Sequence, residues 1–281
     1  MSVIYFIFQQ TMYFMIPLMI VALGAMFSER SGIINIALEG IMTMGAFTGI
    51  LFIHFTGGTM SGQMQLILAV LISMATGMFF SLFHGYASIN MKANQVISGT
   101  ALNMFAPAFA IFVARVIQGV QQVQFTNTFR ITSVPVLGKI PFIGPLLFQN
   151  AYITTYIGIG IFVISTIVLY KTRFGLRLRM VGENPKAAAT VGLPVHRIKY
   201  IAVVCCGMLA GLGGAYLSID HLDMYVRDMS AGRGYIAVAI MILARYNPIM
   251  VVLCALIFGF SDAVQISLQG YGVPSQIMAM I

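Results

Sequence analysis

KTRFGLRLRMVGENPKAAATVGLPVHRIK, residues 171–199, is the stretch from which the fold of this chain can be worked out. It contains seven of the fifteen Lys and Arg residues of the chain and one acidic residue, Glu183. The apolar runs on either side are each about twenty residues long, which is enough to cross the hydrocarbon core of a bilayer. We therefore interpret the stretch as a basic loop between two membrane spans.

The middle of this loop, residues 184–192, has the sequence of a short helix with its own start and stop. Asn184 suits the N-cap, because its side-chain oxygen can accept a free backbone N–H. Pro185 suits the first helical position, and Gly192 suits the left-handed residue that ends a helix. A turn between two spans needs no such helix, so we interpret it as a docking surface on the cytosolic side. A basic loop that only follows the positive-inside tendency is an equal alternative on composition alone.

The composition indicates a polytopic α-helical membrane protein. Of the 281 residues, 59% are hydrophobic and 8% are charged, whereas a soluble domain carries about 25% charged residues. The net charge of +8 does not indicate nucleic-acid binding, because nearly half of the basic residues lie in one loop between spans. The three cysteines all fall in apolar runs, which indicates small buried side chains rather than disulfides or metal ligands.

We expect an all-α polytopic membrane fold of about eight to nine transmembrane helices, with interrupted helices, in a single domain covering residues 1–281. The predicted spans are residues 3–27, 33–54, 63–89, 96–113, 151–170, 200–219 and 249–268, with a shorter apolar helix at 235–244. Residues 115–150 are predicted to form an external loop, with a hairpin or re-entrant piece near 140–148. The chain ends seven residues into a further apolar segment, 275–281, which we interpret as an incomplete C-terminal helix.

The basic loop also predicts the orientation in the membrane. If this loop is cytosolic, the alternation of spans places Arg30, Lys92 and Arg245 on the same side. That side then holds ten of the fifteen Lys and Arg residues, as the positive-inside rule requires. Arg233 is among the five basic residues predicted to lie outside.

A weak inverted repeat relates two parts of the chain. The apolar run that follows Ser31 and Gly32 begins inside, and the run that follows residues 231–234 begins outside. Inverted repeats with interrupted, Gly-rich helices are typical of the central pathway of transporters. Gly207 and Gly211 form a GxxxG pair that lets helix backbones approach closely, and packing within one subunit is the favoured interpretation.

Several polar residues lie in or beside the predicted spans. Asn35 and Glu39 are four residues apart and share one helix face, and Asn94, Gln95 and Asn103 lie further along. A carboxylate near a span is costly and tends to face a bundle interior or a wet cavity. We therefore predict that these five residues line a translocation pathway. For Glu39, a purely structural carboxyl group is an equal alternative.

The chain has no recognisable catalytic or metal-binding motif. A GxxxxGK[ST] phosphate loop does not occur, so the chain cannot bind ATP by that motif. The four histidines are scattered at positions 54, 84, 196 and 221, and neither GxSxG nor HExxH is found. A membrane-embedded enzyme is therefore disfavoured.

Four blocks of sequence carry a family resemblance. They are SERSGIINIALEG at 28–40, NQVISG at 94–99, GLRLR with VGENPKAA at 175–188, and AGRG at 231–234. In this order they resemble the permease subunits of ABC importers, the family that includes branched-chain amino acid and ribose permeases. Within it the chain looks most like the bacterial nucleoside and simple-sugar branch, over residues 3–281.

The resemblance implies a coupling helix that sits in a groove of a cytosolic ABC ATPase subunit. The residues carried over to this role are Glu183, Asn184, Pro185, Lys186, Ala187, Ala188 and Gly192. It also implies a second permease subunit, the same or homologous, and an external substrate-binding lipoprotein, assembled in the lipid of the bacterial inner membrane. The chain needs no cofactor or metal of its own, because the partner ATPase binds ATP and Mg²⁺.

The expected function is import of nucleosides or related simple sugars by alternating access, driven by that separate ATPase. The leading alternative is an ion-coupled secondary carrier without an ATPase. Such a carrier would use Glu39 and Asp262 as proton or sodium sites.

Overall fold

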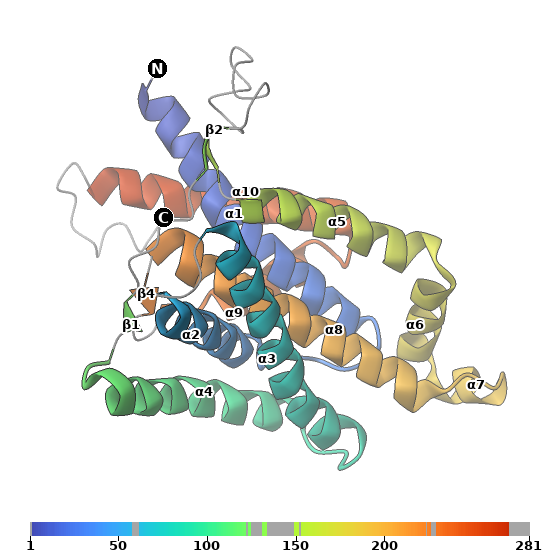
Figure 1. Ribbon diagram of the computed structural model, residues 1–281. Helices are drawn as coiled ribbons and strands as arrows, with labels where there is room; N and C mark the ends of the chain where they lie inside the picture. Colours follow the sequence, from blue (N-terminus) through green and yellow to red (C-terminus); the bar gives the residue numbers. More distant parts are fainter. Residues whose placement is uncertain are drawn as a thin grey trace.

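The computed structural model describes residues 2–57, 62–121, 123–124, 131–133, 149–151, 153–222, 224–225 and 229–269 (Figure 1). The described α-helices are α1 (Ser2–Glu29), α2 (Leu38–Thr56), α3 (Gln63–Ile89), α4 (Gln95–Gln118), α5 (Ile153–Lys171), α6 (Arg173–Glu183), α7 (Pro185–Thr190), α8 (Val195–Ala215), α9 (Arg233–Leu243) and α10 (Pro248–Gln269). A π-helix, η3 (Tyr216–Leu222), continues α8. Short strands form two antiparallel pairs, β1 (Val123–Gln124) with β4 (Met224–Tyr225) and β2 (Ile131–Ser133) with β3 (Gln149–Ala151).

Seven of the described helices are long and apolar enough to cross a membrane, and α9 is a shorter apolar helix of 11 residues. The all-α membrane fold predicted from the composition is thus confirmed. A helix of this length rises about 16 Å, roughly half of the hydrocarbon thickness, so α9 is an interrupted helix of the kind predicted. The predicted terminal helix at 275–281 and the predicted piece at 140–148 lie outside the described residues.

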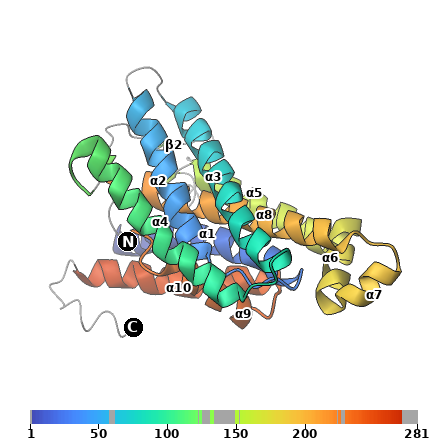
Figure 2. The same cartoon turned by 90° about the horizontal axis from the view of Figure 1, so that it is seen from below.

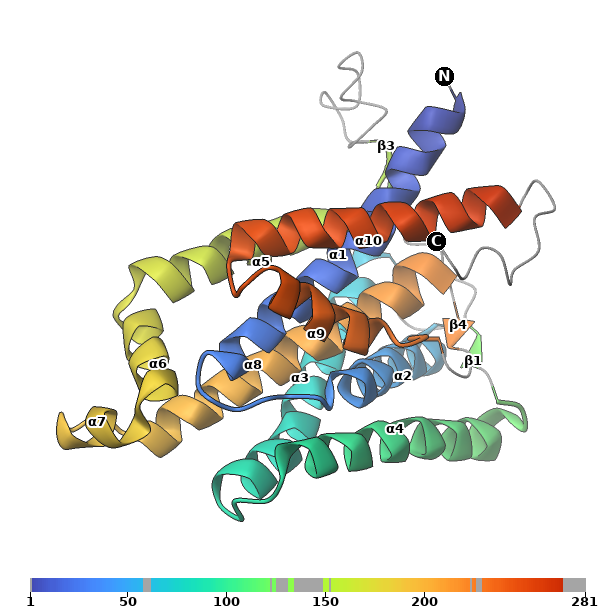
Figure 3. The ribbon, with the colours of Figure 1, turned by 180° about the vertical axis from the view of Figure 1, so that it is seen from behind.

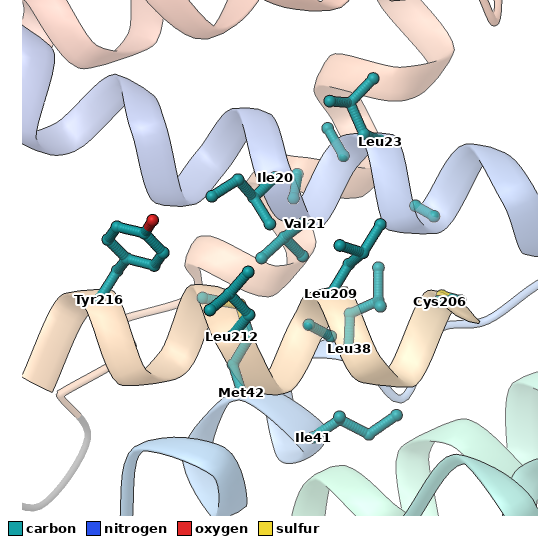
Figure 4. Close-up of a cluster of buried hydrophobic side chains, with 14 of the residues drawn as sticks. Ile20, Val21, Leu23, Leu38, Ile41, Met42, Cys206, Leu209, Leu212 and Tyr216 are labelled. Carbon is teal, nitrogen blue, oxygen red and sulfur yellow. The ribbon is translucent and has the colours of Figure 1, made fainter. Parts of the chain in front are cut away.

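The core of the bundle lies where α8 packs against α1, α2 and α3 (Figure 2). A close-up of this core shows apolar side chains of α1, α2 and α8 pointing toward one another (Figure 4). The labelled side chains are Ile20, Val21 and Leu23 of α1, Leu38, Ile41 and Met42 of α2, and Cys206, Leu209 and Leu212 of α8, with Tyr216 where the chain continues beyond α8. By contrast, α4, α5 and α10 leave most of their residues at least partly exposed, as expected for helices that face lipid.

Glycines let α3 and α8 touch backbone to backbone. A Cβ atom on Gly77 would overlap the carbonyl oxygen of Gly207, and one on Gly211 would overlap the carbonyl oxygen of Ser73. No other residue fits at such a crossing, because every other residue carries a Cβ atom. The GxxxG pair therefore serves packing within one subunit, as the sequence favours.

Three helix boundaries differ from the prediction. Residues 33–37 are not helical, so α2 begins at Leu38 rather than at residue 33. In the other direction, α4 continues to Gln118 beyond the predicted start of the external loop, and α8 begins at Val195 rather than at residue 200. The prediction followed the edges of the apolar runs. In the structure, α4 and α8 continue beyond those edges, whereas the mostly apolar residues 33–37 are left out of α2.

The basic loop also contains a helix that the sequence reasoning missed. In α6, Gly175, Leu178 and Val181 recur every three residues and are buried, while Arg173 and Arg177 are exposed. This spacing is typical of an amphipathic helix. The density of charge in the loop concealed the pattern.

Candidate functional site

The basic loop forms an arm at one end of the bundle, in which α6 and α7 connect the ends of α5 and α8 (Figures 1 and 3). At the first corner of the arm, the hydroxyl of Thr172 accepts the N–H of Gly175 at 3.3 Å. A Cβ atom on Gly175 would overlap the carbonyl oxygens of Val168 and Leu169. This close contact fixes the direction of α6 relative to α5.

The second helix of the arm, α7, has the caps that the sequence predicts. The side-chain oxygen of Asn184 accepts the N–H groups of Lys186 and Ala187 at 3.1 and 3.0 Å, and Pro185 occupies the first turn. Gly192 has a left-handed φ of 81° and donates its N–H to the carbonyl of Ala189 at 3.0 Å. Residues at its own two ends therefore cap the helix.

The side chains of α7 divide into one anchor and an open surface. Ala188 is fully buried in the apolar core where the arm folds back. The other residues predicted for coupling are all exposed, namely Glu183, Asn184, Pro185, Lys186, Ala187 and Gly192. Ala188 therefore seats the helix on the chain, while its neighbours form the surface available to another protein.

Three polar segments meet behind α7, where α6 ends. A Cβ atom on Gly182 would overlap the carbonyl oxygen of Arg30, so α6 touches the turn between α1 and α2 directly. The Arg30 side chain in turn donates to the carbonyl oxygen of Tyr246 at 3.2 Å, in the turn between α9 and α10. A cavity of about 280 Å³ lies beside these contacts, lined by Glu29, Arg30, Arg179, Gly182, Glu183 and Tyr246.

This junction was not predicted as part of the site, apart from Glu183. Two polar breaks, at 28–32 and 245–248, were its signal in the sequence, and each of them separates two apolar runs. The segments predicted to lie on the cytosolic side do meet at this end of the bundle. At the same end, Tyr200 at the start of the sixth predicted span donates its hydroxyl to Asn90, just before Lys92, at 2.6 Å.

The predicted pathway residues nearest to the break at 33–37 hold that break in place. Asn35 accepts the N–H of Ala37 at 3.1 Å and donates to the sulfur of Cys206 at 3.3 Å. Gln95 accepts the N–H of Ile34 at 2.8 Å. His84, which was not predicted, bonds the carbonyl oxygen of Ile34 at 3.0 Å. Irregular backbone inside a membrane protein persists where protein groups satisfy it in this way.

Glu39 and Asn103 bring α2, α4 and α9 together. The two carboxylate oxygens of Glu39 accept the N–H groups of Gly232 and Gly234 at 2.9 and 2.6 Å, at the start of α9. The side-chain oxygen of Asn103 accepts the N–H of Gly40 at 2.8 Å, and its amide donates to the hydroxyl of Tyr235 at 2.8 Å. A negative group at a helix N-terminus is favourable, because it faces the positive end of the helix dipole.

Asn94 differs from the other four predicted pathway residues. It is exposed and caps α4, with its side-chain oxygen accepting the N–H of Val96 at 2.9 Å. All five residues thus make hydrogen bonds within the chain. Their role in a pathway stays a prediction.

Arg233, for which an outside position was predicted, contacts two of the long helices. Its side chain lies over the ring of Phe14, near the middle of α1, and pairs with Asp262 of α10 at 3.4 Å. Asp262 is 14 residues from the start of α10, which corresponds to about 21 Å along the helix axis. The side of the membrane on which Arg233 lies stays a prediction. In the described part of the chain, His, Cys, Asp and Glu do not gather into a group of three that could hold a metal ion.

Comparisons with known proteins agree with this architecture. A family model described as "Branched-chain amino acid transport system / permease component" matches residues 7–280. The guanosine ABC transporter permease protein NupQ of Bacillus subtilis is 41% identical over 258 residues, which cover 91% of this chain and 80% of that protein. The nucleoside ABC transporter permease protein NupC of Lactococcus lactis is 40% identical, covering 86% of this chain and 76% of that protein.

A solved structure has a similar fold. It is described as "An inward-facing conformation of a putative metal-chelate type ABC transporter", with a TM-score of 0.53 and 17% identity. The match covers 95% of this chain and 81% of that chain. At this identity the likeness concerns the arrangement of the helices alone.

Proposed function

The chain belongs to the family of branched-chain amino acid transport system permeases, and from this premise we propose that it is the membrane subunit of an ABC importer for nucleosides. It is a multi-pass protein of the bacterial plasma membrane. The nucleoside substrate is inferred from the two relatives that are 40% and 41% identical and are named for guanosine and nucleosides. Related simple sugars are the second substrate class. Competition of labelled nucleosides, sugars and amino acids for uptake distinguishes these classes.

The proposal includes three partners. A cytosolic ABC ATPase subunit binds ATP and Mg²⁺ and supplies the energy, since the chain has no phosphate loop of its own. A second permease subunit, the same or homologous, completes the membrane part, and an external lipoprotein delivers the substrate. Basic residues that flank α7 can meet acidic ATPase surface or anionic lipid headgroups.

The observation that supports the coupling role best is the structure of α7. It is a short helix of about 9 Å, capped at both ends, seated through Ala188 and exposed on its remaining sides. A capped helix moves as a rigid body, so it can pass a push from the ATPase to the spans. Movement of the spans then exposes the substrate site to the other side of the membrane.

Matched tryptophan substitutions test this role. Ala187 is exposed on α7, and Ala93 is exposed in the turn between α3 and α4, predicted to lie on the same side. Ala187→Trp is expected to block the groove of the ATPase, so copurification of the ATPase and ATP-driven uptake in vesicles should both fall. Ala93→Trp should leave both unchanged. Equal uptake by the two variants would contradict a docking role for α7.

The energy source separates this proposal from the secondary carrier. Uptake that depends on ATP inside vesicles supports the importer, whereas uptake abolished by a protonophore alone supports the carrier. In the structure, Glu39 is bonded to two backbone N–H groups and Asp262 is paired with Arg233. Both carboxylates thus already have partners within the chain.

A further inference from the structure

The turn between α9 and α10 has an unusual backbone. Arg245 and Tyr246 have left-handed φ angles of 50° and 58°, although neither is glycine. Such residues are strained and persist when the surrounding structure holds them, and strain of this kind gathers at functional sites. Contacts with the rest of the chain must therefore hold this turn in place.

Residues from two other parts of the chain hold this turn. The carbonyl oxygen of Tyr246 accepts two hydrogen bonds, from the Arg30 side chain at 3.2 Å and from the Tyr170 hydroxyl at 3.0 Å. The Arg30 guanidinium also lies over the Tyr246 ring, 5.3 Å from its centre. The Tyr246 hydroxyl donates to Glu29 at 3.4 Å. Tyr246 is thus bound to the end of α1 through both its backbone and its side chain.

The same turn connects to the arm that carries α7. Gly182 lies two residues before the Asn184 cap, and its backbone touches the carbonyl of Arg30. Arg179 of α6 lies over the ring of Tyr170, 5.3 Å from its centre. A continuous set of contacts therefore links α6 to Arg30 and Tyr170, and links both of these to Tyr246.

These contacts lie at the ends of two long helices, where a small displacement can move both. α1 is a core helix, and α10 packs along it. A displacement of the turn after α1, together with the turn before α10, would move both helices at their inner ends. The cavity of about 280 Å³ beside Gly182 and Tyr246 leaves space for α6 to shift without unpacking the core.

We propose that Arg30 and Tyr246 are positioning residues that transmit movement of α7 and α6 to the inner ends of α1 and α10. This inference rests on the proposed function, because it requires an ATPase to move α7. It assigns to the α9–α10 turn a part in coupling ATP hydrolysis to transport. The proposed role requires contact with neither substrate nor nucleotide.

The test uses the complete complex reconstituted in vesicles, with ATP hydrolysis and nucleoside uptake measured on the same sample. Tyr246→Leu removes both the ring under Arg30 and the hydroxyl bonded to Glu29. We expect hydrolysis to continue while the substrate moved per ATP falls about tenfold, within the usual range of coupling between sites. The conservative Tyr246→Phe keeps the ring and should retain most of the coupling.

A second variant protects the test against misfolding. Arg30→Gln removes the cation over the ring and leaves the bond from Tyr170 in place, so the turn keeps one donor. Like Tyr246→Leu, it should lower the amount of substrate moved per ATP hydrolysed. Tyr86→Leu makes the same side-chain change at an exposed tyrosine of α3 outside the junction, and should keep the wild-type ratio.

The outcomes separate the two proposals. If no ATPase copurifies with the wild-type chain, the proposed function itself fails. The second case is that the ATPase is present and every assembled variant of the two, Tyr246→Leu and Arg30→Gln, keeps the wild-type ratio of uptake to hydrolysis. The junction then has no coupling role. A lowered ratio in either variant, with Tyr86→Leu normal, supports the inference.

Discussion

Within residues 33–40, the chain leaves the helical conformation at 33–37 inside the bundle, whereas α7 forms a helix outside it. The first region is held by side chains from α4, Gln95 and Asn103, and by His84 of α3. The second is held by the caps at its own ends, Asn184 and Gly192. Inside the membrane, polar groups are used to satisfy the chain itself. At the inner face, the local caps leave the surface of α7 available to another protein.

The largest effect on stability is expected from a substitution that removes hydrogen bonds of the first region. Asn103→Leu leaves the N–H of Gly40 and the carbonyl oxygen of Ile36 without the partner they have in the structure. Each buried polar group left unsatisfied costs about 1–3 kcal/mol, so we expect a loss of about 3 kcal/mol in unfolding free energy. Denaturant unfolding in detergent measures it, with Asn94→Ala at the exposed cap as the milder control. Unchanged stability would mean that water replaces the amide.

Glu39→Gln tests the same region more gently. A glutamine keeps one acceptor oxygen for Gly232 or Gly234 and loses the charge that faces the start of α9. We expect a loss of about 1–2 kcal/mol, since hydrogen bonds to charged groups are stronger than neutral ones. If stability falls and substrate affinity is retained in Glu39→Gln, and affinity is retained also in Asn103→Leu, the pathway assignment for these residues is wrong.

The third prediction moves to α7. Asn184→Ala removes the acceptor of two N–H groups, and loss of an N-cap costs about 1 kcal/mol. Because the helix lies outside the core, the midpoint of global unfolding should hardly change. Hydrogen exchange at Ala187 and Ala188 should speed up, and binding of the ATPase should weaken. Asn184→Asp, which keeps an acceptor, should restore both.

The smallest effect on stability is expected at the exposed residue before the cap. Surface substitutions of this kind change stability by about 0.5 kcal/mol or less. Glu183→Arg should therefore leave unfolding unchanged while lowering ATP-driven uptake, if this side chain faces the partner. Normal uptake with normal stability would remove Glu183 from the docking surface.

The two regions also differ in how far the sequence predicts them. The start and end of α7 were predictable because Asn184, Pro185 and Gly192 act on neighbours within a few residues. The break at 33–37 was not, because its partners lie far away in sequence: Ile34 is bonded to Gln95, and Asn35 to Cys206. Asn35 and Glu39 were placed on one helix face, whereas a break in the backbone separates them.

The junction at Tyr246 shows the same limit. Polar breaks between spans were visible at 28–32 and 245–248, and nothing in their spacing showed that they touch. Gly182 gave no signal either, since its role is to admit the carbonyl of Arg30 rather than to bond with it. Local sequence patterns predict the class of the fold, the number of long helices and the capped helix. They do not predict contacts between turns that are distant in the sequence, and those contacts are known only from the structure.

The crossing of α3 and α8 has a mechanical consequence for the transport cycle. Gly77, Gly207 and Gly211 bring the two backbones into contact, with the small Ser81 side chain against Gly207, so we expect neither helix to slide or roll without collision. We expect this pair of helices to keep a fixed relative position while other helices of the subunit move. The helices free to move relative to this pair are then α4 and α5, which pack more loosely at the rim.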